Sequence, residues 1–128
     1  MFKFCTNSKK QGDVGLGVAI GWFSSNGHTV CIPLTDSQDY DLIVDNSGSL
    51  FKVQVKTTKY KENGIFIVAL KTCGGNRSRI FSKLFDNTKV DLLFVLTETG
   101  QKYLIPSLEI EASSAIRLGE KYASFLVT

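Results

Sequence analysis

Three polar residues, Asp41, Gln54 and Lys56, have the types and spacing needed to act on a phosphate. Mg²⁺ prefers oxygen ligands, keeps several water molecules and usually takes one or two carboxylates from a protein. Asp41 offers a carboxylate, Gln54 an amide oxygen and Val55 a main-chain carbonyl, so the sequence predicts a Mg²⁺ site here. Lys56 can stabilise negative charge on a phosphate, or help to orient and deprotonate a water. The set suits hydrolysis of a phosphodiester bond.

The residues that must position this set form a predicted β-hairpin, with strands at 40–45 and 50–58. Side chains alternate between the faces of a strand, so apolar residues share one face while Asp41, Gln54 and Lys56 share the other. A turn centred on residues 47–48 places apolar residues opposite one another, whereas a shift by one residue would oppose them with polar ones. The predicted pairs are Val44 with Phe51, Leu42 with Val53, and Asp41 with Gln54.

The same three residues have a plainer interpretation. They could be the solvent-facing side of an antiparallel hairpin, where a cross-strand Asp–Lys pair contributes about a few tenths of a kcal/mol. Short motifs also match by chance. The hairpin pattern alone therefore leaves both interpretations open.

Length and composition are typical of one globular domain spanning residues 1–128, with 43% hydrophobic and 21% charged residues. No apolar run approaches the roughly 20 residues that cross a bilayer, and the first residues lack the layout of a signal peptide. We therefore expect a cytoplasmic protein with no membrane partner. Three widely spaced cysteines and a single histidine disfavour a zinc site and a disulfide framework.

The basic residues are clustered, although the net charge is only +3. Clusters of Lys and Arg favour a partner rich in phosphate. A solvated surface with ordinary lysines explains the charge alone equally well. If the partner is duplex DNA, the candidates for contacts with its phosphates or bases are Lys9, Lys10, Lys59, Arg77, Arg79 and Lys83.

The first predicted element is a helix over residues 11–26, ended by Gly27. Its several glycines weaken a helix, so we expect packing to hold it and some glycines to mark close approach of another backbone. A strand follows at 28–33, before the hairpin.

The second half of the chain predicts further strands at 64–72, 90–97 and 102–106. The near-continuous apolar runs at 64–72 and 90–97 indicate central positions in the sheet. Residues 72–89 form a glycine-led, basic segment, which is the natural candidate for a loop that contacts a partner. A short helix is predicted from Ser107, and an additional helix should pack from this half. The prediction is an α/β fold with a mixed central sheet flanked by helices.

The order of helix, strand, Tyr40-Asp41-Leu42, turn and Gln54-Val55-Lys56-Thr57 resembles the PD-(D/E)XK nuclease superfamily, with Gln54 in place of the second motif acid. More narrowly, it resembles the group I intron-encoded homing endonucleases of that superfamily. The similarity also includes residues 11–15, 90–94 and 103–106. It implies a restriction-endonuclease-like fold, Asp41 as a metal ligand, Lys56 as the motif lysine, cleavage of duplex DNA with Mg²⁺, and assembly into a homodimer or homotetramer.

The sequence departs from the family in the first helix. A glutamate that completes the metal site usually stands where this chain has Leu16, and leucine cannot bind a cation. Asp13 lies one turn earlier on the same side of the helix and is a possible substitute. The departure predicts weak metal affinity and slow or absent cleavage. Two alternatives to a homing-type enzyme stay open: a degenerate protein that binds DNA or serves as an assembly subunit or inhibitor, and a Holliday-junction resolvase.

Overall fold

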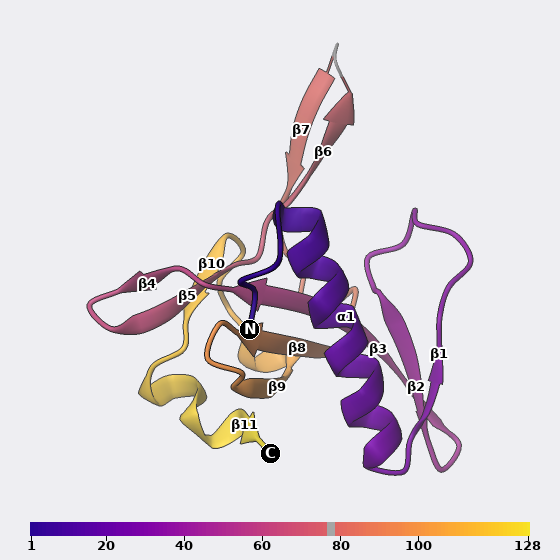
Figure 1. Ribbon diagram of the computed structural model, residues 1–128. Helices are drawn as coiled ribbons and strands as arrows, with labels where there is room; N and C mark the ends of the chain where they lie inside the picture. Colours follow the sequence, from indigo (N-terminus) through magenta and orange to yellow (C-terminus); the bar gives the residue numbers. More distant parts are fainter. Residues whose placement is uncertain (77–78) are drawn as a thin grey trace.

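The computed structural model of the protein describes residues 1–76 and 79–128, and for 73–76 and 79–82 it describes the backbone only. One α-helix comes first and strands make up most of the remainder (Figure 1). Within the described part of the chain, no helix has both the length and the apolar character that crossing a bilayer requires.

Helix α1 (Ser8–Ser25) begins earlier than the periodicity indicated, because Asn7 caps it. The side-chain oxygen of Asn7 accepts the N–H of Lys10 at 2.9 Å and so satisfies one of the donors at the start of the helix. The helix ends as predicted at Gly27, whose φ of +85° is a left-handed conformation that glycine adopts at little cost.

A six-stranded mixed sheet forms the centre of the fold, as predicted. Its strands in spatial order are β1 (Thr29–Cys31), β2 (Leu42–Asn46), β3 (Ser49–Thr58), β8 (Leu92–Thr97), β9 (Lys102–Pro106) and β11 (Leu126–Val127). β3 and β8 run parallel, while the other neighbouring pairs are antiparallel.

The β2–β3 hairpin has the register that the apolar pattern predicted. Leu42 pairs with Val53 and Val44 pairs with Phe51. The turn residues Ser47 and Gly48 both have positive φ, +53° and +96°. Two such residues give the turn a twist that matches the twist of the strands.

Smaller elements lie outside the central sheet. A three-stranded sheet contains β4 (Lys61–Glu62), β5 (Ile65–Ala69) and β10 (Ala115–Arg117). A hairpin of β6 (Thr72–Asn76) and β7 (Arg79–Lys83) projects away from both sheets (Figure 1). The 3₁₀ helices are η1 (Ser107–Glu109) and η2 (Glu120–Phe125).

Hydrophobic cores lie on both faces of the central sheet. On one face, Phe23 of α1 packs with Leu42, Val53 and Phe94. On the other face, a cluster that includes Phe66 and Val68 of β5 packs with Leu93 and Val95 of β8. β8 therefore supplies side chains to both cores, which explains why its sequence is almost continuously apolar.

Three predictions for the second half of the chain were wrong. The apolar run at 64–72 forms β5 of the small sheet rather than a central strand, because an apolar run does not specify the sheet to which a strand pairs. Residues 72–76 and 79–83 pair as strands β6 and β7 rather than forming a loop. The additional flanking helix is replaced, among the described residues, by the 3₁₀ helices, of which η1 coincides with the short helix predicted from Ser107.

Candidate active site

Asp41 lies just before β2. Its side chain accepts a hydrogen bond from β3 where β2 no longer provides a main-chain acceptor. β2 starts at Leu42, opposite Val53, while β3 continues to Thr58. On this unpaired stretch the N–H of Val55 donates to Oδ2 of Asp41 at 2.7 Å. The N–H and C=O of one strand residue point to the same edge, so the Val55 carbonyl also faces this edge. A carboxylate and a main-chain carbonyl therefore meet at the start of β2.

The predicted pairing of Asp41 with Gln54 was wrong in detail. The N–H of Asp41 donates to the Val53 carbonyl at 2.8 Å, and the ladder stops at the pair of Leu42 with Val53. The physical reason is that the exposed N–H of Val55 needs an acceptor, which the Asp41 side chain supplies. Asp41 consequently lies at the edge of β3, whereas Gln54 stands on its face.

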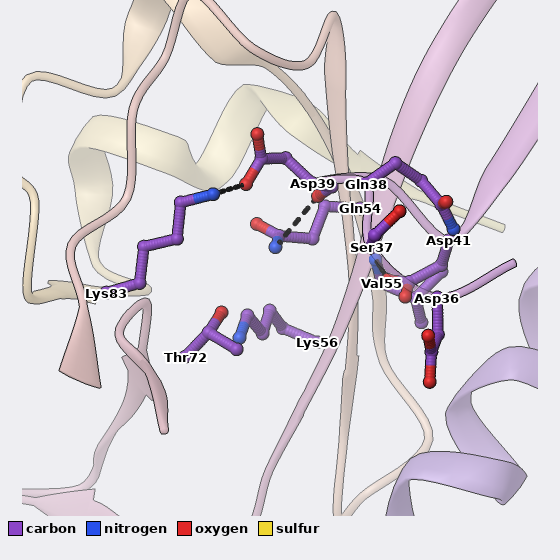
Figure 2. Close-up of a pocket in the computed structure, with 10 residues that line it drawn as sticks. All are labelled: Asp36, Ser37, Gln38, Asp39, Asp41, Gln54, Val55, Lys56, Thr72 and Lys83. Atoms are coloured by element: carbon purple, nitrogen blue, oxygen red, sulfur yellow. Dashed lines mark hydrogen bonds and ion pairs between the residues drawn. The ribbon is translucent and has the colours of Figure 1, made fainter. Parts of the chain in front are cut away.

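Gln54 is held by the loop that precedes β2. Its Nε2 donates to the main-chain carbonyl of Asp39 at 3.2 Å. Its Oε1 is buried and has no hydrogen-bond partner among the described residues. Figure 2 shows the amide turned towards Asp39, on the side of the pocket where Lys83 lies, with Asp41 on the other side beside Val55. Gln54 thus presents an oxygen with unused lone pairs.

Lys56 is the next residue on the same face of β3. Its side chain extends in the direction of Thr72 (Figure 2). The positive charge of Lys56 lowers the pKa of Asp41, so the ammonium and the carboxylate interact electrostatically. The ammonium is therefore placed within electrostatic reach of any anion that approaches Asp41.

The pKa of Asp41 is raised above its ordinary value. The largest cause is desolvation of the carboxyl group by surrounding protein, even though part of the residue remains exposed. The hydrogen bond from Val55 and the charge of Lys56 act in the opposite direction, but they do not compensate for desolvation. The negative charge of Asp41 is thus only partly balanced by the protein.

The three predicted residues line one pocket of about 490 Å³, which we call the site pocket (Figure 2). Its lining is Asp36, Ser37, Gln38, Asp39, Asp41, Gln54, Val55, Lys56, Thr72 and Lys83. Strand β3, the loop before β2 and the base of the β6–β7 hairpin all contribute. Segments far apart in sequence therefore meet around one carboxylate.

A second hollow, which we call the helix-side hollow, also borders Asp41 and Val55. Its volume is about 350 Å³, and α1 supplies the remaining lining with Lys9, Gly12, Asp13 and Leu16. The residue that departs from the family pattern, Leu16, thus faces the predicted metal ligand. Asp13 reaches the same hollow, which keeps it a candidate for the missing acid.

The position of α1 against β3 is fixed by contacts with Thr57. A Cβ at Gly15 would lie 2.4 Å from Cγ2 of Thr57, so only glycine permits this approach. The Nε2 of Gln11 donates to Oγ1 of Thr57 at 2.8 Å. The sequence predicted that some glycines of this helix would mark close approach; Gly15 is such a glycine, although it meets the side chain of Thr57 rather than a backbone, and it fixes where Leu16 lies relative to Asp41.

Asp39 and Thr72 were not identified from the sequence. The Asp39 carboxylate forms an ion pair with Lys83, and its carbonyl holds Gln54. Thr72 pairs with Lys83 at the base of the β6–β7 hairpin. Asp39 falls in the irregular stretch before β2, where periodicity gives no signal. The acidic loop next to the motif was the one available indication.

The predicted DNA-contacting residues are dispersed. Lys9 lines the helix-side hollow and Lys83 the site pocket, so both are near Asp41. Lys10 is exposed in the first turn of α1. The pKa of Glu98 is lowered mainly by the N–H of Phe2, with a smaller effect of Lys59, which places Lys59 near Glu98. Arg77 lies outside the described residues, and Arg79 is described by its backbone in β7.

The donor set at Asp41 fits a hard divalent cation with few protein ligands. In the described part of the chain, no three His, Cys, Asp or Glu side chains are grouped closely enough to hold a metal ion together. Mg²⁺ does not require them, because one or two carboxylates with carbonyls and water suffice. The incompletely balanced Asp41, the Val55 carbonyl and the unpartnered oxygen of Gln54 supply such a set.

Comparison with known proteins agrees with the motif and its geometry. A model of the PD-(D/E)XK endonuclease family matches residues 6–124. A solved structure of the bacterial homing endonuclease I-Ssp6803I is similar, with 31% sequence identity and a TM-score of 0.75, covering 89% of this chain and 79% of that one. No curated protein sequence matches significantly. The resemblance and the restriction-endonuclease-like fold are thereby confirmed, and the chain belongs to the PD-(D/E)XK endonuclease family.

Proposed function

We propose that the protein is a Mg²⁺-dependent endonuclease that hydrolyses phosphodiester bonds of duplex DNA, in the manner of a homing endonuclease. The observation that supports this most strongly is the meeting of Asp41, Gln54 and Lys56 in one polar pocket at the β2–β3 hairpin. A carboxylate on the solvent-facing side of a hairpin would stay hydrated, whereas the Asp41 carboxylate is partly desolvated. Carboxylates with raised pKa values in a pocket are typical of functional sites.

In this proposal Asp41 and the Val55 carbonyl hold Mg²⁺, and Gln54 contributes its oxygen directly or through a water molecule. When bound, Mg²⁺ supplies positive charge that polarises the scissile phosphate. The N–H of Val55 keeps the Asp41 carboxylate turned to the edge of β3. Asp41 must be ionised to bind a cation, so its raised pKa predicts that binding is lost at a higher pH than for an ordinary aspartate.

Lys56 acts on the phosphate rather than on the metal. Its ammonium can stabilise the negative charge that develops on the phosphate oxygens, because it stands on the same face of β3 as the Gln54 amide. Its interaction with Asp41 places it close enough to serve the same phosphorus.

Duplex DNA is the proposed partner, and its phosphates would meet basic residues on both sides of Asp41. Lys9 and Lys83 belong to the two hollows that share Asp41, and they are the first candidates for phosphate contacts. Lys10, Lys59, Arg77 and Arg79 are proposed to extend the contact surface. A homodimer or homotetramer would lengthen the DNA site beyond the reach of one chain.

The test is cleavage of supercoiled plasmid and of an intron-less target DNA with Mg²⁺ or Mn²⁺. Lys56→Ala should lower the rate by about 100-fold or more, as expected for loss of a group that stabilises the transition state. Its DNA affinity should stay within a few-fold, since one phosphate contact is lost. Lys52→Ala is the matched control, because Lys52 is exposed on the same strand and does not line the site pocket. Unchanged turnover of Lys56→Ala would remove Lys56 from the mechanism.

A second candidate function is favoured by Leu16 alone. Its apolar side chain faces Asp41 where the family pattern has an acid, so the chain could bind DNA, or act as an assembly subunit or inhibitor, without cutting. The same experiment separates the two functions. Tight, salt-sensitive DNA binding with no cleavage in either metal would support the second and contradict the enzyme.

A further inference from the structure

Gln54 carries an amide with one donating and one accepting end, and its role depends on which end faces the pocket. Its Nε2 donates to the Asp39 carbonyl at 3.2 Å, and its Oε1 is buried without a hydrogen-bond partner among the described residues. A reversed amide would place Oε1 against the Asp39 carbonyl oxygen, which is repulsive because both atoms are acceptors. The Asp39 carbonyl therefore selects the orientation in which the oxygen, rather than the NH₂ group, is left without a protein partner.

Asp39 itself lies in the irregular loop before β2 and must be held from outside that loop. Within the loop, Gln38 bonds to Thr35, which does not fix Asp39. The Asp39 carboxylate pairs instead with the ammonium of Lys83, at the end of β7. The Asp39 side chain is 29% exposed and that of Lys83 57%, so the pair is partly shielded from solvent.

Lys83 belongs to the base of the β6–β7 hairpin, where it pairs with Thr72 of β6. Both residues line the site pocket, together with Asp39 and Gln54 (Figure 2). A chain of contacts thus runs from the projecting hairpin through Lys83 and Asp39 to the Gln54 amide.

We propose that Asp39 and Lys83 are positioning residues, which keep the oxygen of Gln54 rather than its NH₂ group without a protein partner and so leave the oxygen for a metal ion or its water, and which tie the base of the β6–β7 hairpin to the site pocket. The inference rests on the proposed metal-dependent function. It goes beyond that function by assigning a role to two residues outside the motif and by giving Lys83 a function besides contact with DNA.

The sign of the Lys83→Met effect separates positioning from simple electrostatics. Removing a cation from the pocket should by charge alone tighten binding of a divalent cation. Loss of positioning should weaken it, because the Gln54 amide becomes free to turn its NH₂ group towards the metal. The probe is Mn²⁺ binding to the full chain, measured by calorimetry or by the EPR signal of free Mn²⁺.

We expect Lys83→Met to weaken Mn²⁺ binding about two- to fivefold, the range of a partly exposed ion pair. Lys83→Arg should restore the affinity, because it preserves the pair with Asp39. Lys121→Met is the charge-matched control, since Lys121 is exposed in η2 and does not line the site pocket. It should leave Mn²⁺ binding unchanged.

A double-mutant cycle tests whether Lys83 acts through Gln54. In a Gln54→Ala background the Lys83→Met effect on Mn²⁺ binding should disappear. Equal or tighter binding by Lys83→Met, or an undiminished effect without Gln54, would overturn the inference while leaving the metal site intact. Absence of Mn²⁺ binding by the wild-type chain would instead overturn the proposed metal dependence together with the inference. Circular dichroism of each variant checks that the fold is retained.

Discussion

The site pocket and the helix-side hollow share Asp41 but differ in chemistry. The site pocket adds the amide of Gln54, the ammonium of Lys56 and a loop carboxylate held by Lys83. The helix-side hollow adds Lys9, Gly12, Asp13 and Leu16 of α1. Asp41 therefore stands between a pocket with an amide and an ammonium from β3 and a hollow in which leucine takes the place of the family's glutamate.

In the proposed function, the groups that bind metal and phosphate therefore come from β3 and the loop before β2 rather than from α1. The helix packs closely against β3, because Gly15 and Gln11 both contact Thr57. What it lacks at Leu16 is a ligand. In the proposed function, the ligands expected from β3 and the loop before β2 are therefore present, whereas the helix has leucine at the position of the family's glutamate.

The largest expected effect comes from moving the helix away from Thr57. Gly15→Ala should destabilise the fold by about 1–3 kcal/mol, the usual cost of overpacking, because the new Cβ would lie 2.4 Å from Thr57 Cγ2. Gly17→Ala is the matched control on the same helix, since its Cβ would meet nothing within 4 Å. It should stabilise by about 0.5–1 kcal/mol through helix propensity. Urea unfolding of both variants measures the contrast.

If Gly15→Ala were as stable as the wild type, the close approach of α1 would not fix the helix-side hollow. A rise in stability with Gly17→Ala alone would support the packing described for Gly15.

A smaller effect is expected from adding a donor to the helix-side hollow. Leu16→Glu should tighten Mg²⁺ or Mn²⁺ binding by about tenfold, because a second carboxylate would face Asp41 across the hollow. Leu16→Gln is the control of similar shape without the charge, and it should change binding much less. Calorimetric titration gives both affinities. Unchanged affinity in Leu16→Glu would show that a side chain at position 16 does not reach the metal.

The smallest effect concerns the stability cost of Asp41. Its pKa is raised in the folded state, so the fold is penalised once the carboxyl ionises. Asp41→Asn removes this penalty and can still accept the N–H of Val55, so we expect the melting temperature at neutral pH to rise by a few degrees at most. The gain should vanish below pH 3.8, the ordinary pKa, and grow as pH rises towards the raised folded value.

Added Mg²⁺ should reverse this order, because it stabilises the wild type and not the variant. Equal melting curves with and without Mg²⁺ in the wild type would contradict a metal site at Asp41, whereas a stabilised variant that still responds to Mg²⁺ would place the site elsewhere.

Local pattern was enough to predict the β2–β3 register and the end of α1 at Gly27, and it indicated that some glycine of this helix would lie in close contact without showing which one. Each depends on neighbours in sequence or on alternation along one strand. The assignment of residues 64–72 to the central sheet failed because both a central strand and a strand of a small covering sheet can be apolar. The start of α1 was missed because the capping interaction of Asn7 precedes the apolar repeat.

The motif residues could also be chosen from sequence, since Asp41, Gln54 and Lys56 belong to one hairpin and one family pattern. Their final geometry could not. The Asp41 side chain accepts the N–H of Val55, and Asp41 does not continue the pairing of β2 with β3. This arrangement depends on where that pairing ends. Asp39 and Lys83 meet only when the base of the β6–β7 hairpin packs beside the loop before β2.

By itself, the sequence determined the family, the order of elements and the identity of the groups that could hold a cation or a phosphate. Tertiary structure decided which of them share a pocket, that Leu16 faces Asp41, and that desolvation raises the pKa of that carboxyl. The reason is that register and capping arise from local hydrogen bonds, whereas desolvation and contacts between distant segments exist only when separate elements pack together.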